Sequence, residues 1–189
     1  MNIENLNTEL YSIKHISDND FDKIRKFRIN KKEGRGLEIY LKAYALNEEK
    51  TNEGRTYLII DNETKEVVAY FTLKAGLVTQ KIGLFKFNNS PGIEIANFAV
   101  NDAYREAHDD IIPQIGKYIF SEFIYPIIAD LSTLLGIAYV YIFALPQNRL
   151  MKHYESMGFT RMDAGLERFL HRHVRPEYDR GCIFMYKRI

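Results

Sequence analysis

The sequence predicts one α/β (α+β) domain, in which a single central sheet carries helices on both faces. Short runs rich in Val, Ile, Tyr and Phe read as strands, whereas Ile115, Ile119 and Phe123 recur every four residues, as on one face of a helix. The five prolines and eleven glycines are scattered, and no repeat or linker interrupts the pattern. We therefore expect one domain over residues 1–189, with strands and helices interspersed.

The first part of the chain is expected to form a strand, two helices and further strands. The first helical segment follows Asp18 or Asp20 as a cap and places Phe21, Ile24 and Phe27 on its apolar side. The other segments are identified by period and turn residues, and they are the strand Tyr11–Ile16, the helix Leu37–Leu46, and the strands Arg55–Ile60, Glu66–Leu73 and Ile93–Val100.

The second part is expected to form a long helix, a buried strand, a short helix and a last strand. The long helix starts near Pro113, should kink at Pro126, and ends at Gly136. Its apolar face continues through Ile127 and Leu131 to Leu135. The later segments are the strand Ala138–Leu145, the helix Asn148–Met157 closed by Gly158, and the strand Cys182–Lys187.

Composition excludes several classes of protein. The net charge is +1, so no global field favours nucleic acid or membrane. The single cysteine, Cys182, permits no internal disulfide and fits a reducing compartment, where we expect it to be a buried hydrophobe. We interpret Leu131–Asn148 as a helix end followed by a strand rather than a membrane span, and predict a cytoplasmic protein without a membrane partner. His171 and His173 lack a nearby third ligand, so no metal site is predicted.

The segment Ile93–Phe159 resembles the core of the GNAT superfamily of N-acetyltransferases. The matching pieces are IEIANFAV, QIGKYIF, YVYIFAL and NRLMKHYESMGF, the last of which resembles the family's "N…Y…GF" signature. The upstream run GRTYLIIDNETKEVVAYFTLKAG resembles the family's second and third strands. The resemblance implies a mixed, mostly antiparallel sheet with splayed fourth and fifth strands. It also implies transfer of an acetyl group from acetyl-CoA to a primary amine by direct attack in a ternary complex.

The same resemblance implies where acetyl-CoA is bound. Its pantetheine arm would add to the open edge of the fourth strand, and its pyrophosphate would lie at the start of the following helix. The residues expected to bind it are Phe98, Ala99 and Val100 on the strand, Ile115, Gly116 and Lys117 at the helix start, and Asn148. For Asn148, an N-cap of the short helix is an alternative role.

Two side chains are expected to carry the chemistry. Tyr154 matches the family tyrosine that faces the cofactor sulfur, and its hydroxyl would protonate the leaving thiolate as general acid. The alternative for Tyr154 is a packing role. Glu94 lies on the same strand face as Phe98 by period two and would take a proton from the amine, directly or through water. A strand glutamate in a salt bridge is the alternative for Glu94.

The phosphate loop departs from the family pattern. Gln114 stands where the family has its first glycine, and Ile111 stands at the Gln/Arg position. Asp109 and Asp110 precede the loop and would repel a pyrophosphate. These departures leave a second hypothesis, a non-catalytic GNAT-fold module with a degenerate CoA site that serves in binding or regulation.

The acceptor is not defined by a motif. Leu37–Leu73 resembles the corresponding part of toxin-type GNAT acetyltransferases, which acetylate aminoacyl-tRNA, but the near-zero net charge argues against a large tRNA footprint. Two basic runs favour tRNA instead. They are Lys23–Arg35 and the arginines Arg168, Arg172, Arg175 and Arg180. We favour a small-molecule or protein amine over tRNA, and the sequence leaves a homodimer open.

Overall fold

The structure is a computed structural model that describes residues 3–83, 86–108, 112–173 and 181–189. It contains a seven-stranded sheet in the order β1-β2-β3-β4-β5-β7-β6. The strands are β1 (Tyr11–His15), β2 (Arg55–Asp61), β3 (Val67–Lys81), β4 (Phe87–Val100), β5 (Tyr139–Ala144), β6 (Thr160–Arg161) and β7 (Ile183–Arg188). The pairs β1–β2, β2–β3, β5–β7 and β6–β7 are antiparallel, whereas β4–β5 is parallel. The predicted mixed, mostly antiparallel sheet is therefore confirmed.

Helices separate many of these strands. The α-helices are α1 (Phe21–Arg25), α2 (Arg35–Ala43), α3 (Ala45–Thr51), α4 (Asp102–Ala107), α5 (Ile115–Ile119), α6 (Tyr125–Leu135), α7 (Asn148–Ser156) and α8 (Ala164–His173). Short 3-10 turns form η1 (Ile3–Leu6), η2 (Asp18–Asp20) and η3 (Lys32–Gly34), and η4 (Phe120–Ile124) is a π-helical turn between α5 and α6.

The chain forms two compact units. Unit 1 comprises Met1–Lys74 and Ala96–Asp130, and unit 2 comprises Ala75–Ile95 and Leu131–Ile189. The strands β3 and β4 and the helix α6 each run from one unit into the other. Each unit has a core of its own.

In unit 1, α1, α2 and α3 cover one face of the sheet. Their core cluster contains Leu41 from α2 and Leu58 and Tyr70 from the strands. Tyr70 is fully buried, its ring lies edge-on to that of Phe27, and its hydroxyl donates to the backbone carbonyl of Leu37 over 2.6 Å. Burial of this apolar side of α2 and α3 fixes the two helices against β2 and β3.

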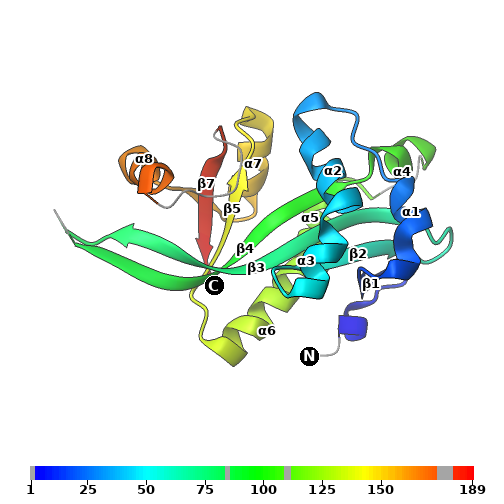
Figure 1. The fold of residues 1–189 in the computed structure, drawn as a ribbon, viewed down its shortest axis with the longest axis horizontal. Helices are drawn as coiled ribbons and strands as arrows, with labels where there is room; N and C mark the ends of the chain where they lie inside the picture. The colour runs from blue at the N-terminus through cyan, green and yellow to red at the C-terminus, as the bar shows by residue number, and fades with distance from the viewer. Residues whose placement is uncertain (1–2, 84–85, 109–111, 174–180) are drawn as a thin grey trace. The chain divides into compact units, whose positions relative to one another are not determined.

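The opposite face of unit 1 carries α5. Tyr11 of β1 lies edge-on to Tyr118 of α5, with 6.0 Å between ring centroids. Tyr11 pairs with Asp61 in the β1–β2 register, so it points away from the face of Leu58. Figure 1 shows α5 behind the strands that α2 and α3 cover. The predicted helices on both faces are therefore present in unit 1.

The long helix contains a wide turn. Predicted core positions Ile115, Ile119, Phe123 and Ile127 are all buried. The π-turn η4 lies immediately before Pro126, whose ring would clash with the carbonyl four residues earlier in a regular α-helix. The wide turn thus accommodates the proline where the sequence predicts a kink.

The segment Ile115–Leu135 is, among the described residues, the one helix long and apolar enough to cross a membrane by length and composition. One side of this segment forms core, as its buried side chains show: Ile115, Ile119, Phe120, Phe123, Ile124, Ile127 and Ile128. Core helices meet the same criterion of length and composition.

Three predicted core positions are wrong. Phe21, Tyr44 and Leu135 are 67%, 58% and 70% exposed. Tyr44 separates α2 from α3, so the continuous period expected over Leu37–Leu46 is interrupted there. At Leu135 the helix is in its last turn before Gly136, which has a φ of 66° and so takes the left-handed conformation that glycine favours.

In unit 2, β5 lies between β4 and β7, and helices cover it on both faces. One face carries Tyr141, Phe184 and Met162, with Leu166 of α8 packed against them. On the other face, the Lys187 ammonium donates to the Met157 carbonyl just after α7. The sequence did not predict α8, β6, or the extension of β3 and β4 toward the hairpin.

Candidate functional site

The parallel ladder between β4 and β5 is short. It pairs Gly92 with Tyr139, Ile93 with Val140, and Glu94 with Tyr141. β4 continues to Val100 and β5 to Ala144, and in the described part of both strands this ladder has no further pair. The edge of β4 that faces β5 is therefore unpaired beyond Glu94, as the predicted splay requires.

The end of β4 is firmly anchored in unit 1. Ala99 is 8% exposed and belongs to the core under α2, while Phe98 and Val100 are half-buried. The next residue, Asn101, is buried and caps α4. Its Oδ1 accepts the N–H groups of Arg28 and Ala103, and its Nδ2 donates to the carbonyl of Val67. Sequence reasoning missed Asn101 because two of these three partners come from distant segments.

Helix α5 begins after a residue in the left-handed conformation. Gln114 is the N-cap residue and has φ 56° and ψ 41°, the left-handed conformation. Its carbonyl accepts the N–H groups of Lys117 and Tyr118, so the N–H groups of Ile115 and Gly116 precede the helical hydrogen bonds. The glutamine thus adopts the conformation that glycine takes most easily. Asp109, Asp110 and Ile111 lie outside the described residues.

Tyr154 is a buried tyrosine on α7 in unit 2. It is 5% exposed, and its ring lies edge-on to that of Phe159. Burial raises the pKa of its hydroxyl well above the ordinary value, so the group keeps its proton at neutral pH. Among the described residues the hydroxyl has no hydrogen-bond partner, and its oxygen is not one of the fully buried atoms that lack one. The raised pKa makes proton transfer to a thiolate more uphill than an ordinary tyrosine predicts.

Glu94 is half-buried on β4, also in unit 2. The Tyr141 hydroxyl donates to its Oε2 over 3.3 Å. Tyr141 lies across β5 and was not among the residues that the sequence indicates. The signal that could have found it is Gly76, a glycine inside a strand pattern, which indicates close approach by another group.

Three other expectations concern unit 2. Asn148 is the first residue of α7 and is exposed, whereas Gln147 occupies the N-cap position, so the N-cap alternative for Asn148 is wrong by one residue. Cys182 is buried beside β7, as expected. The described residues contain no group of three or more His, Cys, Asp and Glu side chains that could hold a metal, and the side chains of His171 and His173 lie outside the described part.

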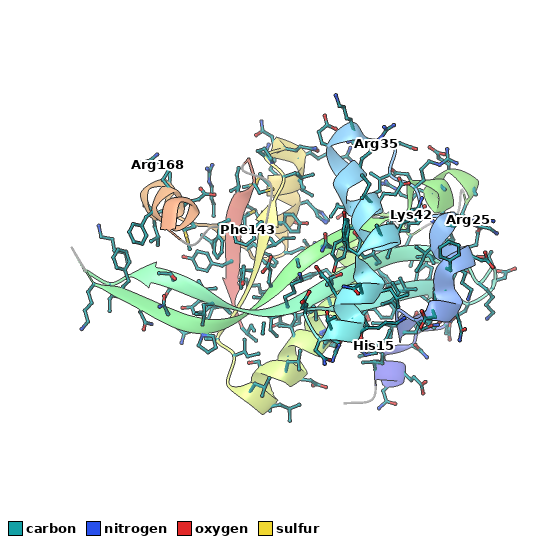
Figure 2. The ribbon with its side chains drawn as sticks, in the orientation of Figure 1. His15, Arg25, Arg35, Lys42, Phe143 and Arg168 are labelled. Atoms are coloured by element: carbon teal, nitrogen blue, oxygen red, sulfur yellow. The ribbon has the colours of Figure 1, made fainter. Side chains whose placement is uncertain are left out.

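The first basic run forms an exposed surface of unit 1. Between Lys23 and Arg35 there are seven basic residues and one acidic residue. Six of the seven are exposed, and none forms an ion pair with a described residue. Figure 2 labels two of them, Arg25 on α1 and Arg35 on α2. In the second run, Arg168 is exposed on α8, and the side chains of the other three arginines lie outside the described part.

No family model and no curated protein matches the sequence. Solved structures do match in fold. A Tyr-to-Phe mutant of the AtaT toxin matches with a TM-score of 0.68 and 15% identity, over 96% of this chain and 91% of that chain. A Tyr-to-Phe mutant of KacT matches with a TM-score of 0.68 and 14% identity, over 95% of each chain.

A third match is AtaT complexed with acetyl-methionyl-tRNAfMet. Its TM-score is 0.65 at 15% identity, over 92% of this chain and 93% of that chain. Another structure of AtaT, together with its antitoxin, contains bound acetyl-CoA. At these identities the likeness shows the fold: the chain has the GNAT fold that the sequence predicts.

Proposed function

We propose that this chain is an acetyl-CoA-dependent N-acetyltransferase, and that its acceptor is the amino group of an aminoacyl-tRNA. The observation that carries the proposal is the short β4–β5 ladder. Beyond Glu94 the edge of β4 that faces β5 offers unpaired N–H and C=O groups, which an extended amide-bearing arm such as pantetheine can pair with as an added strand. Phe98, Ala99 and Val100 lie on this stretch of β4.

The phosphates of acetyl-CoA would lie at the start of α5. Amide N–H groups at a helix start favour anions. Those of Ile115 and Gly116 precede the helical hydrogen bonds here, and the Lys117 ammonium would add a positive charge. Gln114, at the place of the family's first glycine, is in the left-handed conformation that glycine favours. Asn148, exposed at the start of α7, would contact the pantetheine arm.

The residues of unit 2 would move the protons. The amine nitrogen attacks the thioester carbonyl carbon, a C–N bond forms, and the C–S bond breaks. Glu94 accepts the proton of the attacking amine, and Tyr154 donates its hydroxyl proton to the departing thiolate. The Tyr154 hydroxyl keeps its proton at neutral pH and has no acceptor among the described residues, so a thiolate that accepted its hydrogen bond would offset the raised pKa.

The exposed basic run supports tRNA as the acceptor. Net charge does not report how charge is distributed, and this run puts six exposed cations on one segment of unit 1. Lysines and arginines without acidic partners are available for phosphates. The AtaT complex with acetyl-methionyl-tRNAfMet provides a precedent on the same fold.

Titration calorimetry and an acetyl-transfer assay test the proposal together. Acetyl-CoA should bind in the micromolar range, and labelled acetyl should pass to aminoacyl-tRNA but not to deacylated tRNA. Absence of binding up to millimolar acetyl-CoA would favour the non-catalytic module. Binding with transfer only to small amines or proteins would overturn the tRNA acceptor and leave the acetyltransferase standing.

Charge reversal of the basic run locates the acceptor surface. The triple variant Arg25→Glu, Lys31→Glu, Lys32→Glu should raise KM for aminoacyl-tRNA by at least ~10-fold and reduce the salt dependence, since each phosphate contact contributes about one unit to the salt slope. The variant Lys81→Glu, Lys86→Glu reverses exposed lysines of unit 2 and serves as control. An equal loss in both variants would contradict a specific surface in unit 1.

A further inference from the structure

We infer that Tyr141 is a positioning residue that holds the Glu94 carboxylate, and that Gly76 and Gly92 are glycines because they clear the space for its ring. The inference rests on the proposed function, in which Glu94 is the general base. All four residues belong to unit 2, on the neighbouring strands β3, β4 and β5.

The strand register brings the two functional groups together. Tyr141 is the parallel partner of Glu94, in the last pair before the β4–β5 ladder ends. Its hydroxyl donates to Glu94 Oε2 over 3.3 Å. A hydroxyl that donates to a carboxylate restricts its rotation and favours its charged form, which is the form that accepts a proton.

Gly76 and Gly92 leave room for the Tyr141 side chain. A Cβ at Gly76 would lie 1.9 Å from the Tyr141 hydroxyl oxygen and 2.9 Å from Cζ. A Cβ at Gly92 would lie 3.2 Å from the Cδ1 of the same ring. Neither glycine has a positive φ, so backbone freedom is not what these positions require. Their shared feature is that the Tyr141 side chain passes over both.

The ring itself is held by aromatic neighbours. Tyr141 is 5% exposed and stacks on Phe184, with 5.2 Å between centroids and 19° between planes. Phe143 meets it edge-on at 5.8 Å. Packed on these sides, the ring directs its hydroxyl toward Glu94 and has little room to turn away. Figure 2 labels Phe143 on β5, and Tyr141, two residues earlier on the same strand, lies on the same face by period two.

Other titratable groups around this cluster have their own partners. Tyr139 donates its hydroxyl to Gln80 Oε1 over 3.2 Å, and its ring lies edge-on to that of Tyr186. Glu167 of α8 accepts the Phe184 N–H and pairs with Arg161. Tyr139 therefore provides a matched control: it is on the same strand and face, with a similar hydrogen bond, but its acceptor is a neutral amide.

Two measurements on Tyr141→Phe and Tyr139→Phe test the inference. The first is carbon-13 NMR titration of the glutamate carboxyl groups, with Glu94→Gln to assign the signal. The second is the pH profile of kcat/KM for acetyl transfer. Tyr141→Phe should move the titration of Glu94 and the acid limb of the profile upward by about half a pH unit, because a 3.3 Å hydrogen bond to the charged form is lost. Tyr139→Phe should move neither.

The double variant tests the role of the glycine. Gly76→Ala should lower kcat/KM by about 10-fold in the otherwise natural chain, because the Tyr141 hydroxyl must leave its place. In the Tyr141→Phe background the same change should lower kcat/KM by less than about 3-fold, since the oxygen at 1.9 Å is gone and only the contact with the ring Cζ at 2.9 Å remains to be relieved. Such coupling is expected only for groups in direct contact.

The outcomes separate the inference from the proposed function. An unchanged Glu94 titration in Tyr141→Phe would overturn the inference, whatever the activity. A shifted titration with no acetyl transfer by the natural chain would overturn the proposed function. A shifted titration and a shifted acid limb, with no change in Tyr139→Phe, would support both.

Discussion

Unit 1 and unit 2 both contain buried or half-buried tyrosines, and four of their hydroxyl groups differ in the hydrogen bonds that they make. In unit 1, Tyr70 donates to a backbone carbonyl, and Tyr40 donates to Glu48, which also pairs with Lys74. In unit 2, Tyr141 reaches Glu94 at 3.3 Å, and Tyr154 has no partner among the described residues.

These four hydroxyl groups differ in what they contribute to stability. A buried or half-buried donor that meets a good acceptor at 2.6 Å stabilises the fold. A buried donor with a long or missing hydrogen bond contributes little to stability. Unit 2 has two such hydroxyls on residues that the proposal gives chemical roles.

Tyr154→Phe should have the largest effect on activity. We expect kcat to fall by at least ~100-fold, because a general acid contributes about 10²–10⁴-fold. The Kd for acetyl-CoA should change by less than about 2-fold. The free energy of unfolding should not fall, since no described partner loses its hydrogen bond. Steady-state kinetics, calorimetry and denaturant unfolding give the three values, and a clear loss of stability with intact kcat would reverse the assignment.

Tyr70→Phe is the converse variant in unit 1. It removes the 2.6 Å hydrogen bond from the buried Tyr70 hydroxyl to the Leu37 carbonyl, which keeps its helical N–H partner, so the free energy of unfolding should fall by about 0.5–1.5 kcal/mol. The kcat of the remaining folded enzyme should stay within about 2-fold. Urea unfolding and kinetics on the same sample measure both, and a large fall in kcat without a change in stability would break the comparison.

Glu38→Gln tests a carboxylate whose hydrogen bonds stabilise unit 1. Burial raises the pKa of Glu38, but the Lys42 ammonium and the Ile29 N–H, at 2.6 and 2.8 Å, outweigh it and leave the pKa lowered. Because the pKa of Glu38 is lower in the folded state than its unfolded value of about 4.3, its charged form stabilises the fold at any pH above that unfolded pKa. This stabilisation is lost as the pH falls through the folded-state pKa. The free energy of unfolding of the variant should therefore be about 1 kcal/mol lower than that of the natural chain at pH 7, and the same at pH 3. Unfolding curves that differ equally at both pH values would contradict this.

Gln114→Gly should give the smallest change, and a gain. A non-glycine residue in the left-handed conformation is strained, so glycine should raise the free energy of unfolding by about 0.5–1 kcal/mol. Thermal unfolding with Lys117→Gly as a control for glycine inside a helix measures it, since that variant should lose stability. A lower free energy of unfolding in Gln114→Gly would mean that a contact of the glutamine side chain stabilises the fold by more than the backbone strain destabilises it.

Most of the fold could be predicted because its core segments have clear periods. The apolar run in Arg55–Ile60 and the four-residue spacing from Ile115 predict the right elements. The extension of β4 was missed because Pro91 interrupts its pattern, and proline argues against a strand. The α2–α3 break at Tyr44 was missed because apolar residues continue across it.

The candidate site could be predicted only where a sequence motif marks it. Tyr154 is found from its spacing to Gly158 and Phe159, and Glu94 from its place on the strand. Tyr141 could not be found in this way, because its role depends on glycines on two other strands. Only the strand order and register bring these positions together.

The wide turn η4 makes the long helix sensitive to the number of its residues. A π-turn holds one residue more than an α-helical turn, so Phe120–Ile124 acts as a built-in insertion. Deleting one residue there would restore a regular α-helix and leave the following residues facing nearly as before, whereas a deletion elsewhere in the helix would rotate them by about 100°. In the first case Pro126 would meet the carbonyl four residues earlier. In the second case Ile127 and Ile128, now buried, would leave the core. A single-residue deletion scan should therefore find this helix less tolerant than its simple apolar sequence indicates.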